Sequence, residues 1–144
     1  MPTRILTGRC YCGSTTLCAE VEPVVVSYCH CADCRRWTGA PLPAFAAFPT
    51  DALTISPDPG PVTFVPGVER WFCRECGSPM AARFDYLPGQ IYVPVGVLDQ
   101  AAEFPPTMHA HAEAALPWLA LSDALPRHHG SARDSLVHKG GATT

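Results

Sequence analysis

The chain has 144 residues, a net charge of −3 at pH 7 and a sequence pI of about 6.0, which fits one domain. It has no block of basic residues, which argues against a nucleic-acid partner. Its longest apolar runs, such as AFAAF at 44–48, are far shorter than the roughly 20 residues of a membrane-spanning helix.

Short strands are expected along most of the chain. Segments rich in Val, Ile, Phe and Thr alternate with 16 prolines and 11 glycines, and no helical apolar period persists. A short helical turn is expected within 29–39. The expected strands are 5–9, 15–21, 43–48, 53–56, 62–65, 69–72, 80–84, 91–97 and one near 108–113.

This pattern predicts a single mostly β domain, of the sandwich or barrel-like kind, over residues 1–130. Residues 131–144 are small and polar, and we expect them to form a flexible tail. The N-terminal stretch MPTRILTGRC lacks the long apolar segment of a signal peptide, so we expect a cytoplasmic protein.

Eight cysteines are many for a cytoplasmic chain, where thiols are kept reduced. Their close spacing favours metal binding over disulfides. Cys18 stands apart, and we expect it to be an inert buried residue; an eighth metal ligand or a redox partner are the alternatives. The other seven form three groups: Cys10 and Cys12; Cys29, Cys31 and Cys34; and Cys73 and Cys76.

The spacing of these seven thiols does not decide which of them bind the same metal ion. The Cys-x-x-Cys pairs Cys31/Cys34 and Cys73/Cys76 would together make a ribbon-like zinc site. The remaining thiols, with Cys18, would then make a second closed site, and the protein would be a purely structural zinc module.

Three motifs carry a resemblance to a known family: G-x-C-x-C-G at 8–13, C-H-C-x-x-C-R-R-x-x-G-A-P at 29–41 and C-x-x-C-G at 73–77. Together with LPWLALSDALP at 116–126, they resemble the glutathione-dependent formaldehyde-activating enzyme family. The resemblance implies a zinc-stapled, Mss4-like fold of short antiparallel strands. It also implies a structural zinc on Cys10, Cys12, Cys73 and Cys76, and a catalytic zinc on Cys29, Cys31 and Cys34.

The activity that the resemblance implies is that of a carbon–sulfur lyase, which joins glutathione to formaldehyde as S-hydroxymethylglutathione. A zinc with three thiolate ligands keeps one open position and is a poor activator of water, but it suits a soft fourth ligand such as a substrate thiolate. The expected partners are therefore a small thiol and an aldehyde. The alternative is a non-catalytic zinc-binding module with two structural sites, in which Cys18 or His30 is the fourth ligand of the second zinc.

The polar neighbours in the second motif have more than one interpretation each. His30 is expected to point away from the thiols and to hydrogen-bond backbone; a fourth metal ligand or a proton shuttle is the alternative. Arg35 and Arg36 either attract the carboxylates of glutathione or offset the thiolate charge.

Two further histidines, His109 and His111, are expected to share a strand face with Glu113. They lie far from the thiols in the sequence, and the resemblance gives them no ligand role.

Overall fold

The structure is a computed structural model that describes residues 4–140. Short 3₁₀ turns at Thr50–Ala52, Val95–Val97, Ala101–Glu103 and Ala112–Ala114 join some of the main elements. In chain order, these elements are β1 (Leu6–Arg9), β2 (Thr16–Ala19), β3 (Val25–Cys29), α1 (Ala32–Thr38), β4 (Ala44–Pro49), β5 (Leu53–Ser56), β6 (Val62–Val65), β7 (Val68–Phe72), β8 (Pro79–Phe84), β9 (Gln90–Pro94), β10 (His109–Ala110) and α2 (Arg133–Gly140).

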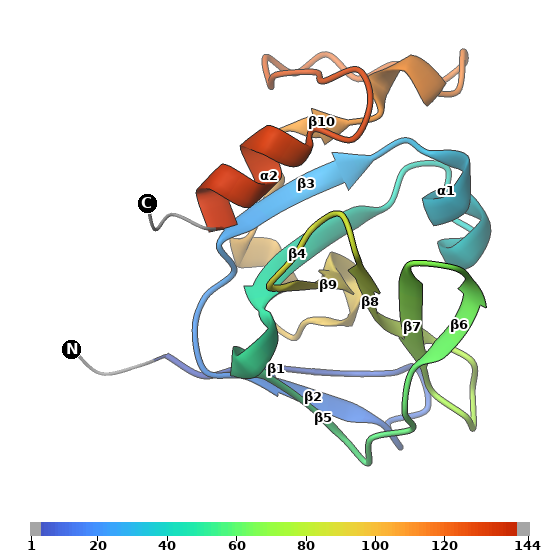
Figure 1. Ribbon diagram of the computed structural model, residues 1–144, viewed down its shortest axis with the longest axis vertical. Coiled ribbons are helices and arrows are strands. Elements are labelled where there is room, and N and C mark those ends of the chain that lie inside the picture. Colours follow the sequence, from blue (N-terminus) through green and yellow to red (C-terminus); the bar gives the residue numbers. More distant parts are fainter. Residues whose placement is uncertain (1–3, 141–144) are drawn as a thin grey trace.

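The strands form two sheets, as Figure 1 shows. The smaller sheet has the order β1-β2-β5, and the larger has the order β10-β3-β4-β9-β8-β7-β6. Every pairing is antiparallel except that of β10 with β3, which aligns His109 with Tyr28 and Ala110 with Cys29. This parallel contact brings a late segment of the chain beside the first cysteines of the second motif.

The central strands of the larger sheet are covered on both faces. On β4, Ala46 and Phe48 belong to a core shared with Leu6 and Leu17 of the smaller sheet. The alternate residues, such as Phe45, belong to a second cluster on the opposite face. Because side chains alternate across a strand, a strand covered on both faces becomes a continuous apolar run, which explains AFAAF.

The expectation of a mostly β domain is confirmed, and the two sheets are packed layers rather than a closed barrel. The expected strands 53–56 and 62–65 have the same bounds as β5 and β6. The predicted strand at 91–97 ends early, because the chain enters a 3₁₀ turn at Val95. Strand β3 was not predicted, although its Val25 and Val26 are buried.

Part of the expected flexible tail is helical. Residues Arg133–Gly140 form α2, and Leu136 is buried in the second core cluster beside Val25 and Tyr92. Two adjacent apolar residues, Leu136 and Val137, among polar ones give no helical period, so the sequence pattern could not reveal the contact of Leu136. Residues 141–144 of the predicted tail lie outside the described residues.

Within residues 4–140, no helix has both the length and the apolar character needed to cross a membrane.

Candidate functional site

Four cysteines from two distant segments meet at one end of the molecule. Cys10 and Cys12 follow β1, and Cys73 and Cys76 occupy the turn between β7 and β8. The Sγ atoms of Cys10 and Cys12 are 3.6 Å apart, and those of Cys12 and Cys73 are 3.8 Å apart. All four Sγ atoms lie within 4.8 Å of one another. We call this group the four-cysteine cluster.

Hydrogen bonds favour the thiolate form of Cys73 in this cluster, although the pKa of Cys12 is raised. The amides of Glu75 and Cys76 donate to Cys73 Sγ at 3.3 and 3.4 Å, and Gly77 closes the turn with a left-handed φ of 78°. The hydroxyl of Ser14 lies 3.3 Å from the same sulfur and contributes most to lowering the pKa of Cys73 to about 5. Charged sulfurs at neutral pH are what a cation needs from such ligands.

The second group, which we call the cysteine loop, comprises Cys29, Cys31 and Cys34. Cys29 ends β3, Cys31 caps the N-terminus of α1, and Cys34 is buried within that helix. Cys31 Sγ lies 3.4 Å from Cys29 Sγ and accepts the Cys34 amide at 3.3 Å. The Cys29 thiol, through its hydrogen bond, is the main cause that lowers the pKa of Cys31, whereas the same contact raises the pKa of Cys29 to about 12. One thiolate, on Cys31, is therefore favoured even without a metal.

His111 joins this loop from the far end of the chain. A ring nitrogen of His111 lies within 4.8 Å of both Cys29 Sγ and Cys31 Sγ. The parallel pairing of β10 with β3 brings the segment here, and His111 then leaves the strand with a left-handed φ of 56°. His109, two residues earlier, is buried elsewhere, so the expected shared face of His109 and His111 is wrong: the turn at His111 separates the two rings.

A pocket of about 480 Å³ opens beside the cysteine loop. All three thiols of the loop and His111 contribute to its wall. The rest of the wall is largely aromatic and aliphatic, and Tyr86 supplies a phenol. Partial burial, with the nearby thiols Cys29 and Cys34, raises the pKa of Tyr86 to about 12, so this phenol keeps its proton at neutral pH. The lining residues most relevant here are Cys29, Cys31, Asp33, Phe45, Phe84, Tyr86 and His111.

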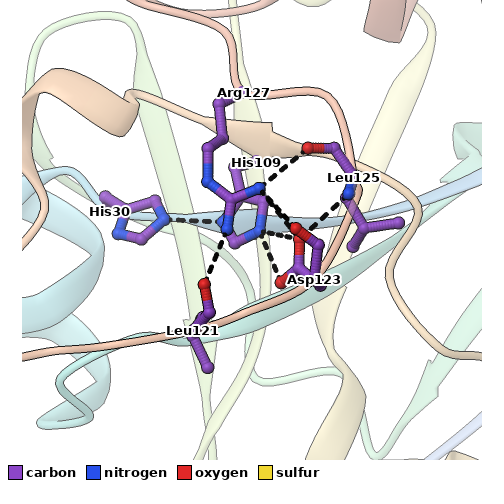
Figure 2. Close-up of polar contacts among 6 residues, drawn as sticks. All are labelled: His30, His109, Leu121, Asp123, Leu125 and Arg127. Carbon is purple, nitrogen blue, oxygen red and sulfur yellow. Dashed lines mark hydrogen bonds and ion pairs between the residues drawn. The ribbon is translucent and has the colours of Figure 1, made fainter.

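Behind the loop, His30 begins a chain of polar contacts that leads through the buried His109 to the exposed Asp123 and Arg127, as Figure 2 shows. Its Nε2 lies 2.8 Å from Nδ1 of His109, whose Nε2 donates to the Asp123 carboxylate at 3.1 Å. Asp123 also accepts from Arg127 at 2.9 Å. Since His109 donates through Nε2, its Nδ1 accepts from His30 Nε2, which leaves His30 Nδ1 as a buried acceptor without a partner in the described structure.

His30 therefore points away from the thiols, as expected, but its partner is a side chain rather than backbone. Burial is the main cause that lowers the pKa of His30, so the ring is neutral in this setting.

The two arginines that follow Cys34 lie outside the pocket beside the thiols. Arg35 Nη1 donates to the carbonyl of Ala114 at 2.8 Å and also to the carbonyl of His30, which ties α1 to the segment after β10. Neither Arg35 nor Arg36 lines the pocket beside the thiols; both lie at a shallow depression on the other side of α1.

Cys18 lies in β2 between Thr7 and Thr54 and is half-buried. Within the described residues it belongs to neither cysteine group. The structure thus brings Cys10 and Cys12 together with Cys73 and Cys76, and keeps the cysteine loop separate. Sequence reasoning missed His111 and Tyr86; the signal for His111 would have been a β3–β10 pairing, which no local pattern encodes.

The donor sets fit zinc. A tetrahedral zinc with metal–sulfur bonds of about 2.3 Å holds its sulfurs about 3.8 Å apart, close to the separations found in the four-cysteine cluster. Thiolate ligands also select zinc over the hard cations magnesium and calcium. The cysteine loop presents the same soft donors, but on the wall of a pocket.

Two layered sheets with one four-cysteine cluster and one cysteine loop on the wall of a pocket define a class of small cysteine-rich β proteins. The sequence profile of the glutathione-dependent formaldehyde-activating enzyme family matches residues 5–114, and the chain belongs to this family. A protein of Schizosaccharomyces pombe, named as an uncharacterized lyase, is 32% identical over 83 residues, which cover 58% of this chain and 59% of that protein. The aligned region thus spans about three-fifths of that relative's length.

A crystal structure of a Rhodobacter sphaeroides protein is also similar. It shares 21% sequence identity, with a TM-score of 0.49 over 85% of this chain and 99% of that one.

Proposed function

We propose that this protein is a zinc-dependent carbon–sulfur lyase that joins a thiol, in the first instance glutathione, to formaldehyde or another small aldehyde. The reaction adds the S–H bond across the C=O bond: a carbon–sulfur bond forms, the carbonyl π bond breaks, and the thiol proton ends on the oxygen. The reverse step cleaves the adduct. The observation that carries the proposal is the placement of three thiols of one loop on the wall of a pocket.

The four-cysteine cluster and the cysteine loop have different roles in this proposal. Cys10, Cys12, Cys73 and Cys76 would hold a structural zinc that fixes the β7–β8 turn to the end of β1. Cys29, Cys31 and Cys34 would hold the second zinc, whose chemistry is to bind a substrate sulfur and favour its thiolate form.

The chain's own groups would assist at this second site. Tyr86 holds a proton at the pocket wall and can donate a hydrogen bond to the developing oxyanion. The His111 nitrogen, next to Cys29 and Cys31, can accept the proton that a bound thiol loses. The pocket brings thiol and aldehyde together, which supplies the proximity that a bimolecular addition lacks in water.

The test is the rate of adduct formation from glutathione and formaldehyde above the uncatalysed rate. Acceleration by the zinc-loaded protein that is lost in Cys31→Ser and retained in Cys18→Ser supports the proposal. Cys18 is a matched control because it is a thiol outside both groups. No acceleration at high protein concentration, with any tested thiol and aldehyde, would reject the enzymatic function.

A second candidate, a non-catalytic zinc module, is favoured by one observation. A ring nitrogen of His111 lies within 4.8 Å of the Sγ atoms of Cys29 and Cys31, in a group that leaves Cys34 out, so His111 can occupy a metal position that the first proposal keeps for the substrate. Cobalt substitution distinguishes the two functions, because an added thiol changes the absorption of an open or displaceable site but leaves a permanently closed one unchanged. An unchanged spectrum in the native protein, together with a response in His111→Ala, would favour the module.

A further inference from the structure

The pocket beside the cysteine loop is a poor match for glutathione. Glutathione carries two carboxylates, and buried carboxylates need cationic or strong hydrogen-bonding partners. Among the described residues that line the pocket there is no lysine or arginine. Asp33 is the one carboxylate in that lining, and it would repel an anionic ligand.

Arginines near the pocket are directed elsewhere. Arg133 Nε donates to the Tyr86 carbonyl at 2.8 Å. The guanidinium of buried Arg70 lies over the rings of Trp37 and Phe84, with centroid distances of 4.4 and 5.7 Å. Arg70 Nη1 has no hydrogen-bond partner within the described structure, yet Arg70 is not part of the pocket lining.

The wall that faces the thiols is instead aromatic. Phe45, Phe84, Tyr86 and Tyr92 line it, and buried Leu136 of α2 adds an aliphatic surface. Phe84 packs edge-on against Tyr92 with a centroid distance of 5.9 Å, and both rings belong to the pocket lining. A volume of about 480 Å³ is far more than formaldehyde fills.

We propose that one of the two substrates of this site, the thiol or the aldehyde, carries an uncharged apolar group about the size of an aromatic ring. This group, the apolar body, occupies the pocket while the sulfur or carbonyl carbon of the same substrate reacts beside the cysteine loop. This inference rests on the proposed function for the reaction and narrows its substrate class, with glutathione and formaldehyde as the reference pair. The apolar body is carried either by the thiol or by the aldehyde, and the experiments below separate the two.

The first test measures binding without reaction. Benzyl methyl sulfide and S-methylglutathione are both thioethers with the same methyl group, so they differ in the body attached to sulfur. Calorimetric titration of the zinc-loaded protein is expected to give a dissociation constant at least about tenfold lower for benzyl methyl sulfide, from the apolar area that its ring buries. Equal or tighter binding of S-methylglutathione overturns the inference.

A matched pair of variants locates the effect. Val68 lines the pocket, whereas Val65, its partner across the β6–β7 hairpin, is exposed and outside it. Val68→Arg places a cation in the pocket and is expected to reverse the order of the two thioethers, while Val65→Arg leaves the order unchanged. The same response in both variants would show that the ligands bind elsewhere, against the inference.

Arg70 offers a competing anchor for a carboxylate. If S-methylglutathione binds more tightly and Arg70→Met abolishes that binding, the guanidinium receives the peptide carboxylate and the apolar assignment is wrong. If Arg70→Met leaves the preference for benzyl methyl sulfide intact, the inference is supported.

Rates then identify the member that carries the apolar body. Benzyl mercaptan with formaldehyde, and glutathione with benzaldehyde, are each compared with glutathione and formaldehyde, always relative to the uncatalysed rate. Enhancement with the first pair assigns the body to the thiol, and enhancement with the second assigns it to the aldehyde. Acceleration of glutathione–formaldehyde above both pairs overturns the inference but supports the lyase. Tight thioether binding without any acceleration rejects the lyase alone.

Discussion

His30 and His109, which are 79 positions apart, are joined by a buried 2.8 Å contact between Nε2 and Nδ1, and their rings stack at 5.1 Å. Replacing His109 by Ala is expected to lower the free energy of unfolding by about 1–3 kcal/mol, because it leaves the buried His30 Nε2 unsatisfied. Urea denaturation measures the loss. The exposed His129 is the matched control, and an equal loss in His129→Ala would contradict this account.

Metal content distinguishes the two cysteine groups. We expect two zinc ions per chain in the native protein and in Cys18→Ser, and one in Cys34→Ser, which should keep its β structure. Cys73→Ser should lose zinc and unfold, because a structural zinc contributes directly to folding free energy. Zinc analysis with circular dichroism measures both quantities. One zinc in the native protein, or a loss in Cys18→Ser, would contradict the assignment.

Gly8 is required by the close packing of β1 against the 3₁₀ turn Val95–Val97. A Cβ at this position would collide with the carbonyl oxygen of Val97, a backbone atom, and would press on the Leu17 side chain. Gly8→Ala is therefore expected to lower the free energy of unfolding by roughly 1–3 kcal/mol, as overpacking does. Gly96→Ala is the control, since a Cβ there meets no atom within 4 Å. Similar stabilities of the two variants would show that the segment adjusts.

Asp123 should make stability depend on pH. Burial alone would raise its pKa, but hydrogen bonds from the Leu125 amide, His109 and Arg127 outweigh that effect and hold the pKa below 3.8. A carboxyl with a depressed folded-state pKa stabilises the fold above its ordinary pKa and loses that effect as the pH falls through the folded value. The melting temperature of Asp123→Asn should thus lie below that of the native protein at neutral pH and approach it in acid. A difference that stays constant from neutral to strongly acidic pH would contradict the carboxylate's role.

The sequence predicts much of the fold because alternation and turn residues are local signals. Strands such as 53–56 and 62–65 were predicted with their bounds, since prolines and glycines mark their ends. Strand β3 was missed because Pro23 and the adjacent cysteines concealed a short valine-rich run. Helix α2 was missed because its packing depends on Leu136 and not on a periodic face.

For the candidate site, motifs predicted which residues matter, but not which residues from elsewhere join them. The spacing of the cysteines left their grouping open. The structure places Cys10 and Cys12 with Cys73 and Cys76, and it places Cys29 and Cys31 with His111, in a group that does not include Cys34. His111 reaches the cysteine loop through a two-residue parallel pairing, a contact between segments about 80 positions apart. A pairing this short leaves almost no pattern in the sequence.

The two cysteine groups also become complete at different times during synthesis. The three thiols of the cysteine loop are synthesised almost together, whereas Cys73 of the four-cysteine cluster is synthesised 61 positions after Cys12. The four-cysteine cluster therefore cannot form before the β7–β8 turn has been synthesised, whereas the three thiols of the cysteine loop are all present about 40 residues earlier.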